Sequence, residues 1–176
     1  LSSVPGGFYG MTLAHTGIAV FVVGITLTSA YSVERDVRMA PGESLELAGY
    51  TFRFEGVKET AGANFQANEG RMVVTRDGEP VAILKPQKRV YRVQRMPMTE
   101  AAIDAGLTRD LFVALGEPLG GEGAWSLRLY HKPFIRWIWI GALFMAIGGL
   151  CAACDRRYRL ALLRSREPGV AMGEAA

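Results

Sequence analysis

Two long apolar runs enclose a central segment in which apolar and polar positions alternate. The first run, 8–30, contains no formally charged side chain and exceeds the roughly 20 residues that a membrane-spanning helix needs. The second run, 132–154, opens with Lys132 and Pro133, and a proline suits a first helical turn. Trp137 and Trp139 follow near that end, where their rings fit the headgroup level of a bilayer. We therefore predict two transmembrane helices.

Between the two runs, apolar residues recur with period two, which predicts antiparallel strands. Leu45 and Leu47 begin the pattern, and 50–54 continue it with aromatic residues at alternate positions. Asp77-Gly78 separates two further apolar stretches and predicts a β-hairpin. The stretches predicted to be strands are 71–75 and 80–84, which form this hairpin, and then 90–94, 111–115 and 124–130.

One short helix is expected among these strands. Thr99 can cap its start, Glu100 favours the positive end of its dipole, and Gly106 can end it in the left-handed conformation. The predicted fold is thus a membrane protein of mixed α and β structure. Two transmembrane helices flank an extracytoplasmic, antiparallel β-rich domain, 31–131, which forms a small barrel or sandwich with one short helix.

The distribution of charge predicts which side of the membrane each segment faces. The net charge is +3, acids slightly outnumber bases in 31–131, and the tail, 155–176, has five arginines directly after the second apolar run. Such a bias marks the cytoplasmic side of a membrane span and argues against nucleic acid as a partner. We expect the end of this tail to be disordered and residues 1–7 to be the N-terminal stub of a longer chain. The five arginines are Arg156, Arg157, Arg159, Arg164 and Arg166.

His15 is the strongest candidate for a functional residue, because it is an ionisable side chain inside the first apolar run. Thr12, Ala19 and Thr26 share its helical face, and they leave room for a neighbouring helix or a flat macrocycle. A metal, a haem iron, a proton relay or a neighbouring helix would explain the imidazole. A hydrogen bond to a nearby Ser, Thr or carbonyl explains it equally well, and both interpretations stay open at this point.

The other candidate functional residues are better explained by structural roles. His131 lies at the membrane end of the domain, where an interfacial aromatic residue is the ordinary need. Cys151 and Cys154 form a C-x-x-C pair on the last turn of the second helix, without the sequence context of a redox or haem-attachment motif. No catalytic residue is predicted. A close-packing surface on the second helix is expected at Ala142, Ala146, Gly149 and Ala153.

Several long strings resemble the CcmF family of cytochrome c-type biogenesis proteins, in their C-terminal part. The strings are GMTLAHTGIAV, YSVERDVRMAPGE, MTEAAIDAGLTRDLFVALGEP and RLYHKPFIRWIWIGALFMAIGGL, with DRRYR after the last. The resemblance extends to about Arg159.

This resemblance implies a role in the system I cytochrome c haem lyase of the bacterial inner membrane. Haem from the chaperone CcmE would be attached covalently to apocytochrome c, with the help of CcmH and CcmI. His15, within GMTLAHTGIAV, would be one axial ligand of a membrane haem b, and quinol would be the electron donor. The resemblance also implies that residues 31–131 are periplasmic and that the C-terminus is cytoplasmic.

The resemblance leaves half of the haem site outside this sequence, because the family's other transmembrane ligand and its tryptophan-rich haem-binding motif lie upstream. The family's relatives typically have tyrosine at the position of His131, so that residue inherits no haem role. The principal alternative is a membrane-anchored β domain that serves as a scaffold or docking module without a haem site of its own. A quinol-oxidising enzyme in its own right is the third hypothesis.

Overall fold

The computed structural model describes residues 6–93, 95–121 and 123–155. The chain divides into two compact units, one formed by the described residues of 1–24 and 137–176, the other by residues 25–136. The predicted basic tail, apart from Asp155, lies outside the described residues.

Two helices begin and end the described chain. Helix α1 spans Gly6–Tyr31 and helix α2 spans Ile135–Ala153. Both are long and apolar enough to cross a membrane by length and composition. The predicted spans, 8–30 and 132–154, agree with these bounds to within three residues. Helix α1 includes Gly6 and Gly7, which the prediction assigned to the N-terminal stub.

The start of α2 differs from the prediction at Pro133. Instead of opening the helix, Pro133 ends the last strand, where it pairs with Arg109. Phe134 follows with φ of +56°, a left-handed conformation that turns the chain, and its N–H donates to the carbonyl of Thr108 at 3.0 Å. A proline has no N–H to give to a ladder, so it is tolerated at the end of a strand. The helix therefore begins at Ile135.

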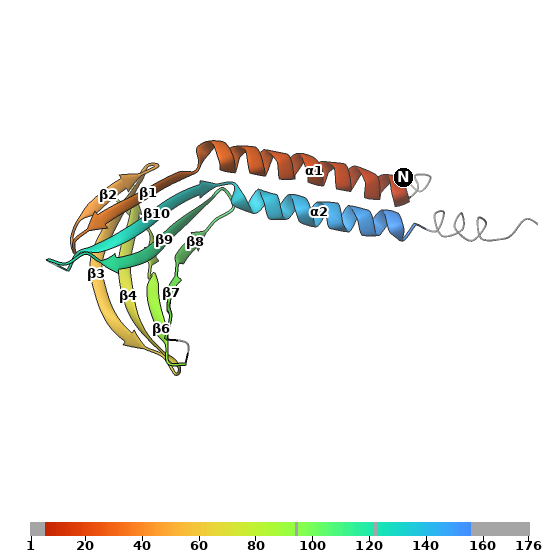
Figure 1. The fold of residues 1–176 in the computed structure, drawn as a ribbon. Helices are drawn as coiled ribbons and strands as arrows, with labels where there is room; N and C mark the ends of the chain where they lie inside the picture. Colours follow the sequence, from red (N-terminus) through yellow and green to blue (C-terminus); the bar gives the residue numbers. More distant parts are fainter. Residues whose placement is uncertain (1–5, 94, 122, 156–176) are drawn as a thin grey trace, which may run out of the picture. The chain divides into compact units, whose positions relative to one another are not determined.

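Among the described residues, ten antiparallel strands follow α1 and precede α2 along the chain, and they form two sheets (Figure 1). One sheet has the order β1-β10-β9-β8, and the other has the order β2-β3-β4-β6-β7, with β5 paired to β4. The strands are β1 Val33–Met39, β2 Ser44–Leu47, β3 Tyr50–Ala61, β4 Phe65–Arg76, β5 Glu79–Leu84, β6 Gln87–Tyr91, β7 Pro97–Glu100, β8 Ala102–Ala105, β9 Arg109–Pro118 and β10 Trp125–Pro133.

The core lies between the inward faces of the two sheets. Alternate residues of β3 and β4 point inward, and Phe52, Phe54, Met72 and Val74 are fully buried. Residues of β9 and β10 meet them from the other sheet: Leu111, Val113, Leu115, Leu127 and Leu129. The domain is thus a sandwich, one of the two architectures that the alternation predicts.

Strand connections join the two sheets at both sides. β1 belongs to the first sheet and β2 to the second, with only residues 40–43 between them. At the other side, β7 belongs to the second sheet and β8 to the first, with only Ala101 between them. Continuous chain therefore runs from sheet to sheet at each side of the sandwich, and it shortens the free edges.

The predicted hairpin is confirmed, with Asp77 and Gly78, both at positive φ, between β4 and β5. The predicted strand 90–94 begins earlier, at Gln87. The predicted short helix is wrong, because residues 97–105 form β7 and β8. Thr99 pairs with Lys88 of β6 instead of capping a helix. Pairing to β6 and β9 satisfies the backbone of this segment and overrides its local helix signals.

Candidate functional site

Helix α1 packs against α2 along a row of glycines. Gly10, Gly17 and Gly24 repeat every seven residues and are the buried residues of α1, while Gly141 and Gly148 are the buried residues of α2. A Cβ on Gly17 would lie 2.7 Å from the Gly141 carbonyl oxygen, and one on Gly148 would lie 2.5 Å from the Ala14 nitrogen. The two backbones are therefore in direct contact, as small residues permit in membrane helix pairs.

The surface expected on α2 does not form this contact. Ala146, Gly149 and Ala153 are exposed, and a Cβ on Gly149 would meet no atom within 4 Å. The contact uses the neighbouring face of α2, which carries Gly141 and Gly148. Spacing alone did not distinguish the two stripes, because both repeat at helical intervals.

His15 lies on the opposite side of α1 from the glycine row. It precedes Gly17 by two positions, which places the two residues roughly 160° apart around the helix. The imidazole is exposed, and so are Thr12 and Thr16 on the neighbouring turns. Helix α2 therefore leaves the His15 face open.

One ring nitrogen of His15 is hydrogen-bonded. Nδ1 lies 2.8 Å from the carbonyl oxygen of Met11, one turn earlier in α1. A carbonyl oxygen only accepts, so Nδ1 carries the proton, and Nε2 presents its lone pair away from that bond. Histidines that bind metal usually have this arrangement, in which the second nitrogen is fixed by a carbonyl or carboxylate. The same contact is also the structural alternative, a histidine satisfied by a carbonyl.

Around His15, the other polar side chains of α1 are satisfied by its own backbone. Thr12 donates to the carbonyl of Phe8 and Thr16 to that of Thr12, each at 2.9 Å. Within the described residues, no group of three or more His, Cys, Asp or Glu side chains could hold a metal ion. His15 therefore offers a single ligand on this face of the helix.

At the N-terminal end of α1, Asp155 has a role that the sequence did not indicate. Its Oδ2 accepts a hydrogen bond from the N–H of Gly7 at 2.6 Å, across 148 positions of sequence. The first N–H groups of a helix lack partners within it, and a carboxylate there is favourable. Cys151 and Cys154 lie near the same end, and both are exposed.

His131 lies in the β domain, at the inward face of β10. Its ring stands 5.9 Å from that of Tyr50, tilted by 30°, and its Nδ1 is buried without a hydrogen-bond partner among the described residues. Burial, and then the charges of Arg109 and Arg76, lower the pKa of His131 from its ordinary 6.5. It is therefore a core-edge residue, and its predicted role as an interfacial aromatic residue remains a prediction.

Four acidic residues of the domain lie in ion pairs with arginines. Asp36 accepts from Arg128 at 2.5 Å, and Asp110 lies 3.6 Å from Arg136. Asp104 pairs with Arg109, and Glu100 with Arg89. A guanidinium thus lies beside each of these four carboxylates, as in a structural ion pair.

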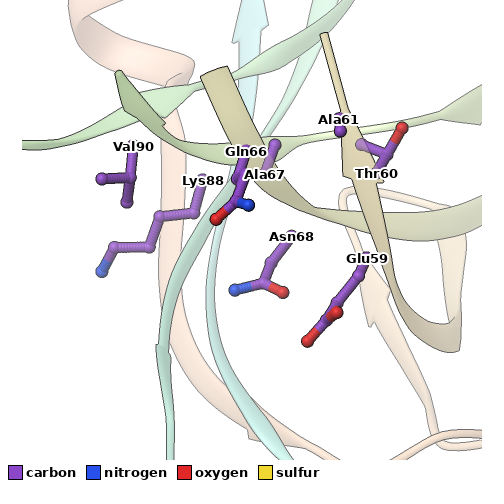
Figure 2. Close-up of a pocket in the computed structure, with 8 residues that line it drawn as sticks. All are labelled: Glu59, Thr60, Ala61, Gln66, Ala67, Asn68, Lys88 and Val90. Carbon is purple, nitrogen blue, oxygen red and sulfur yellow. The ribbon is translucent and has the colours of Figure 1, made fainter. Parts of the chain in front are cut away.

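A hollow of about 450 Å³ opens on the inward face of β3, β4 and β6 (Figure 2). Gln66, Asn68, Glu59 and Lys88 line it with polar groups, and Lys88 also binds Glu117 and the carbonyl of Gly116. Its lining has the hydroxyl of Thr60 and the amine of Lys88, and the amine is paired with Glu117, so neither is arranged as an activated nucleophile.

Known proteins match both the domain and the helices. The model of the CcmF C-terminal beta-sandwich matches residues 30–133, more than half of the chain. The chain belongs to the CcmF family. It is 53% identical over 175 residues to the cytochrome c-type biogenesis protein CcmF of Pseudomonas fluorescens, covering 99% of this chain and 26% of that protein.

Further relatives agree with this family membership. CcmF of Escherichia coli strain K12 is 53% identical over 152 residues, covering 86% of this chain and 23% of that protein. A solved structure of the cytochrome c heme lyase CcmF has the same fold, with a TM-score of 0.69 and 22% identity, over 83% of this chain and 24% of its own. The chain thus spans about a quarter of the length of its CcmF relatives.

Proposed function

We propose that this chain is the C-terminal portion of the membrane subunit of a bacterial cytochrome c haem lyase. Membership of the CcmF family supports this function, since its relatives are named for cytochrome c biogenesis. Haem would be received from CcmE and attached to apocytochrome c presented with CcmH and CcmI.

In this proposal, His15 is one axial ligand of a haem b held within the membrane. The observation that carries this assignment is the Nδ1 hydrogen bond to Met11, which leaves the Nε2 lone pair available on the open face of α1. Haem iron would supply one-electron redox chemistry, with quinol as the electron donor. Met11 would fix the ring orientation and the tautomer, and the second axial ligand would come from outside this chain.

The proposed topology places both helices across the inner membrane. Five arginines after α2 support a cytoplasmic C-terminus, which leaves the β sandwich on the periplasmic side. The sandwich would then face the partner proteins and the apocytochrome.

Cytochrome c maturation in cells tests the proposal. We expect His15→Ala in the complete lyase to abolish maturation, measured by the haem stain of a reporter cytochrome c. Thr16→Ala is the matched control, because Thr16 is an exposed neighbour whose side-chain hydroxyl donates to the Thr12 carbonyl. Normal maturation in both variants would refute the role of His15.

The alternative function is a scaffold, in which the hydrogen bond between Nδ1 of His15 and the Met11 carbonyl is the residue's only role. Under that hypothesis, His15→Gln retains a side-chain hydrogen bond within the helix and leaves maturation intact. Under the haem hypothesis, the same variant fails because an amide is a poor ligand for haem iron.

A further inference from the structure

Four side chains cluster at one end of the β sandwich. Arg76 donates from Nη1, and Arg109 from Nε, to the phenol oxygen of Tyr50, each at 3.2 Å. Both guanidinium carbons lie 5.2 Å from the centroid of the Tyr50 ring. His131 stacks on the same ring. The two guanidinium groups therefore lie close together, because both donate to the same phenol oxygen.

The charge of this cluster is only partly neutralised. Asp104 pairs with Arg109, but the nearest carboxylate to Arg76 is Asp77, whose Oδ2 is 3.8 Å from Nε and whose side chain is 93% exposed. Such an exposed, distant pair contributes little. The positive charge of the two arginines also acts on His131, because Arg109 and Arg76, after burial, both lower its pKa.

Arg76 is also accessible. Its side chain is 59% exposed, compared with 19% for Arg109. Within the described part of the chain, its hydrogen bond to Tyr50 occupies only Nη1, so the rest of the fork is open to a ligand. A guanidinium fork fits the oxygens of a phosphate or a carboxylate.

Strand register places the cluster at the end of the sandwich where the helices join it. His131 pairs with Val33, the first residue of β1, and Arg109 pairs with Pro133, the last residue of β10. Thr28, in the last turn of α1, donates to the carbonyl of Pro133 at 2.7 Å. If α1 and α2 span the membrane, as the proposed function requires, this end of the domain lies at the headgroup level.

We propose that Arg76 and Arg109 bind the phosphate group of an anionic membrane phospholipid. The paired guanidiniums supply donors to the phosphate oxygens, and the unneutralised charge favours a headgroup with net negative charge. The bound lipid would anchor the membrane-facing end of the sandwich. This inference rests on the membrane topology of the proposed function and requires no haem.

His131 supplies the measurement. The chain has two histidines, so the NMR spectrum of the imidazoles contains His131 and, as an internal reference, His15. The chain is dissolved in maltoside micelles, which contain no phosphate, and titrated with acid before and after addition of dihexanoyl phosphatidylglycerol. A phosphate bound at the arginines would neutralise their field and raise the pKa of His131. Inorganic phosphate alone forms the second arm.

Variants separate this site from general charge effects. Arg76→Gln is expected to raise the pKa of His131 without lipid, to remove the further rise on adding lipid, and to weaken lipid binding about tenfold or more. Arg71→Gln is the control, since Arg71 lies on the same strand but pairs with Glu55. If Arg76→Gln does not fold, Arg76→Lys, which keeps the charge but loses the fork, should fold and bind more weakly.

The outcomes are distinct. A lipid-dependent rise that persists in Arg71→Gln and is lost in Arg76→Gln supports the proposal. A rise with inorganic phosphate but not with the lipid overturns the lipid assignment, and no rise with either overturns the site. Neither result bears on haem binding at His15, so a failure here is distinguishable from a failure of the proposed function.

Discussion

Substituting Gly17 tests the contact between α1 and α2. A Cβ at this position would lie 2.7 Å from both the Gly141 carbonyl oxygen and the Met145 nitrogen, and 2.9 Å from Met145 Cγ. Two of these three atoms belong to the backbone, so rotation of a side chain cannot relieve the overlap. Gly17→Ala must therefore move the helices apart, and overpacking of this kind costs about 1–3 kcal/mol.

Gly149→Ala is the matched control on α2, because a Cβ there would meet no atom within 4 Å. It should leave stability unchanged or raise it by up to about 1 kcal/mol through helix propensity. Both variants of the 176-residue chain would be unfolded with SDS in mixed micelles and followed by near-ultraviolet circular dichroism. Equal stability of Gly17→Ala and Gly149→Ala would refute direct backbone contact at this row.

Three further predictions concern stability. Phe54→Ala, at a fully buried core position, should cost about 3–5 kcal/mol in urea unfolding of the sandwich; a loss below about 1 kcal/mol would contradict the assigned core. Asp155→Ala should cost about 1 kcal/mol by removing the acceptor of the Gly7 N–H, and should speed hydrogen exchange in the first turn of α1. Because the pKa of His131 is lowered from 6.5 on folding, the unfolded chain takes up the proton first. The contribution of His131 to the free energy of unfolding should therefore be present above pH 6.5 and be lost as the pH falls towards the pKa of the folded state. In His131→Gln, the free energy of unfolding should depend less on pH over this range.

Much of the fold could be predicted from the sequence because the hydrophobic pattern and the turn residues indicate the same helices and strands that the packed structure has. The two apolar runs are longer than a buried core helix needs, and the period-two pattern of 50–54 coincides with the inward face of β3. Asp77-Gly78 has the turn chemistry that a hairpin requires.

The failures occurred where tertiary pairing decides the outcome. Thr99 and Gly106 carry capping signals for a helix, yet β6 and β9 offer ladder partners that local sequence does not show. Pro133 fits a first helical turn equally well by composition, but its pairing with Arg109 extends β10.

The candidate site was predictable only in part. A histidine in an apolar run is visible in the sequence, and its available Nε2 follows from a contact within one helix, with Met11. The glycine row was harder to predict, because several small-residue stripes compete and only packing selects one. The contact between Asp155 and Gly7 joins opposite ends of the chain, and no local pattern encodes it.

The reduced absorption spectrum of membrane haem b in the purified complete lyase tests the central claim most directly. If the Nε2 of His15 binds the iron, His15→Ala should remove or shift the b-haem bands, while Thr16→Ala should leave them at their original wavelength and intensity. A spectrum of His15→Ala identical to that of the unaltered protein would contradict the assignment of His15 as a haem ligand.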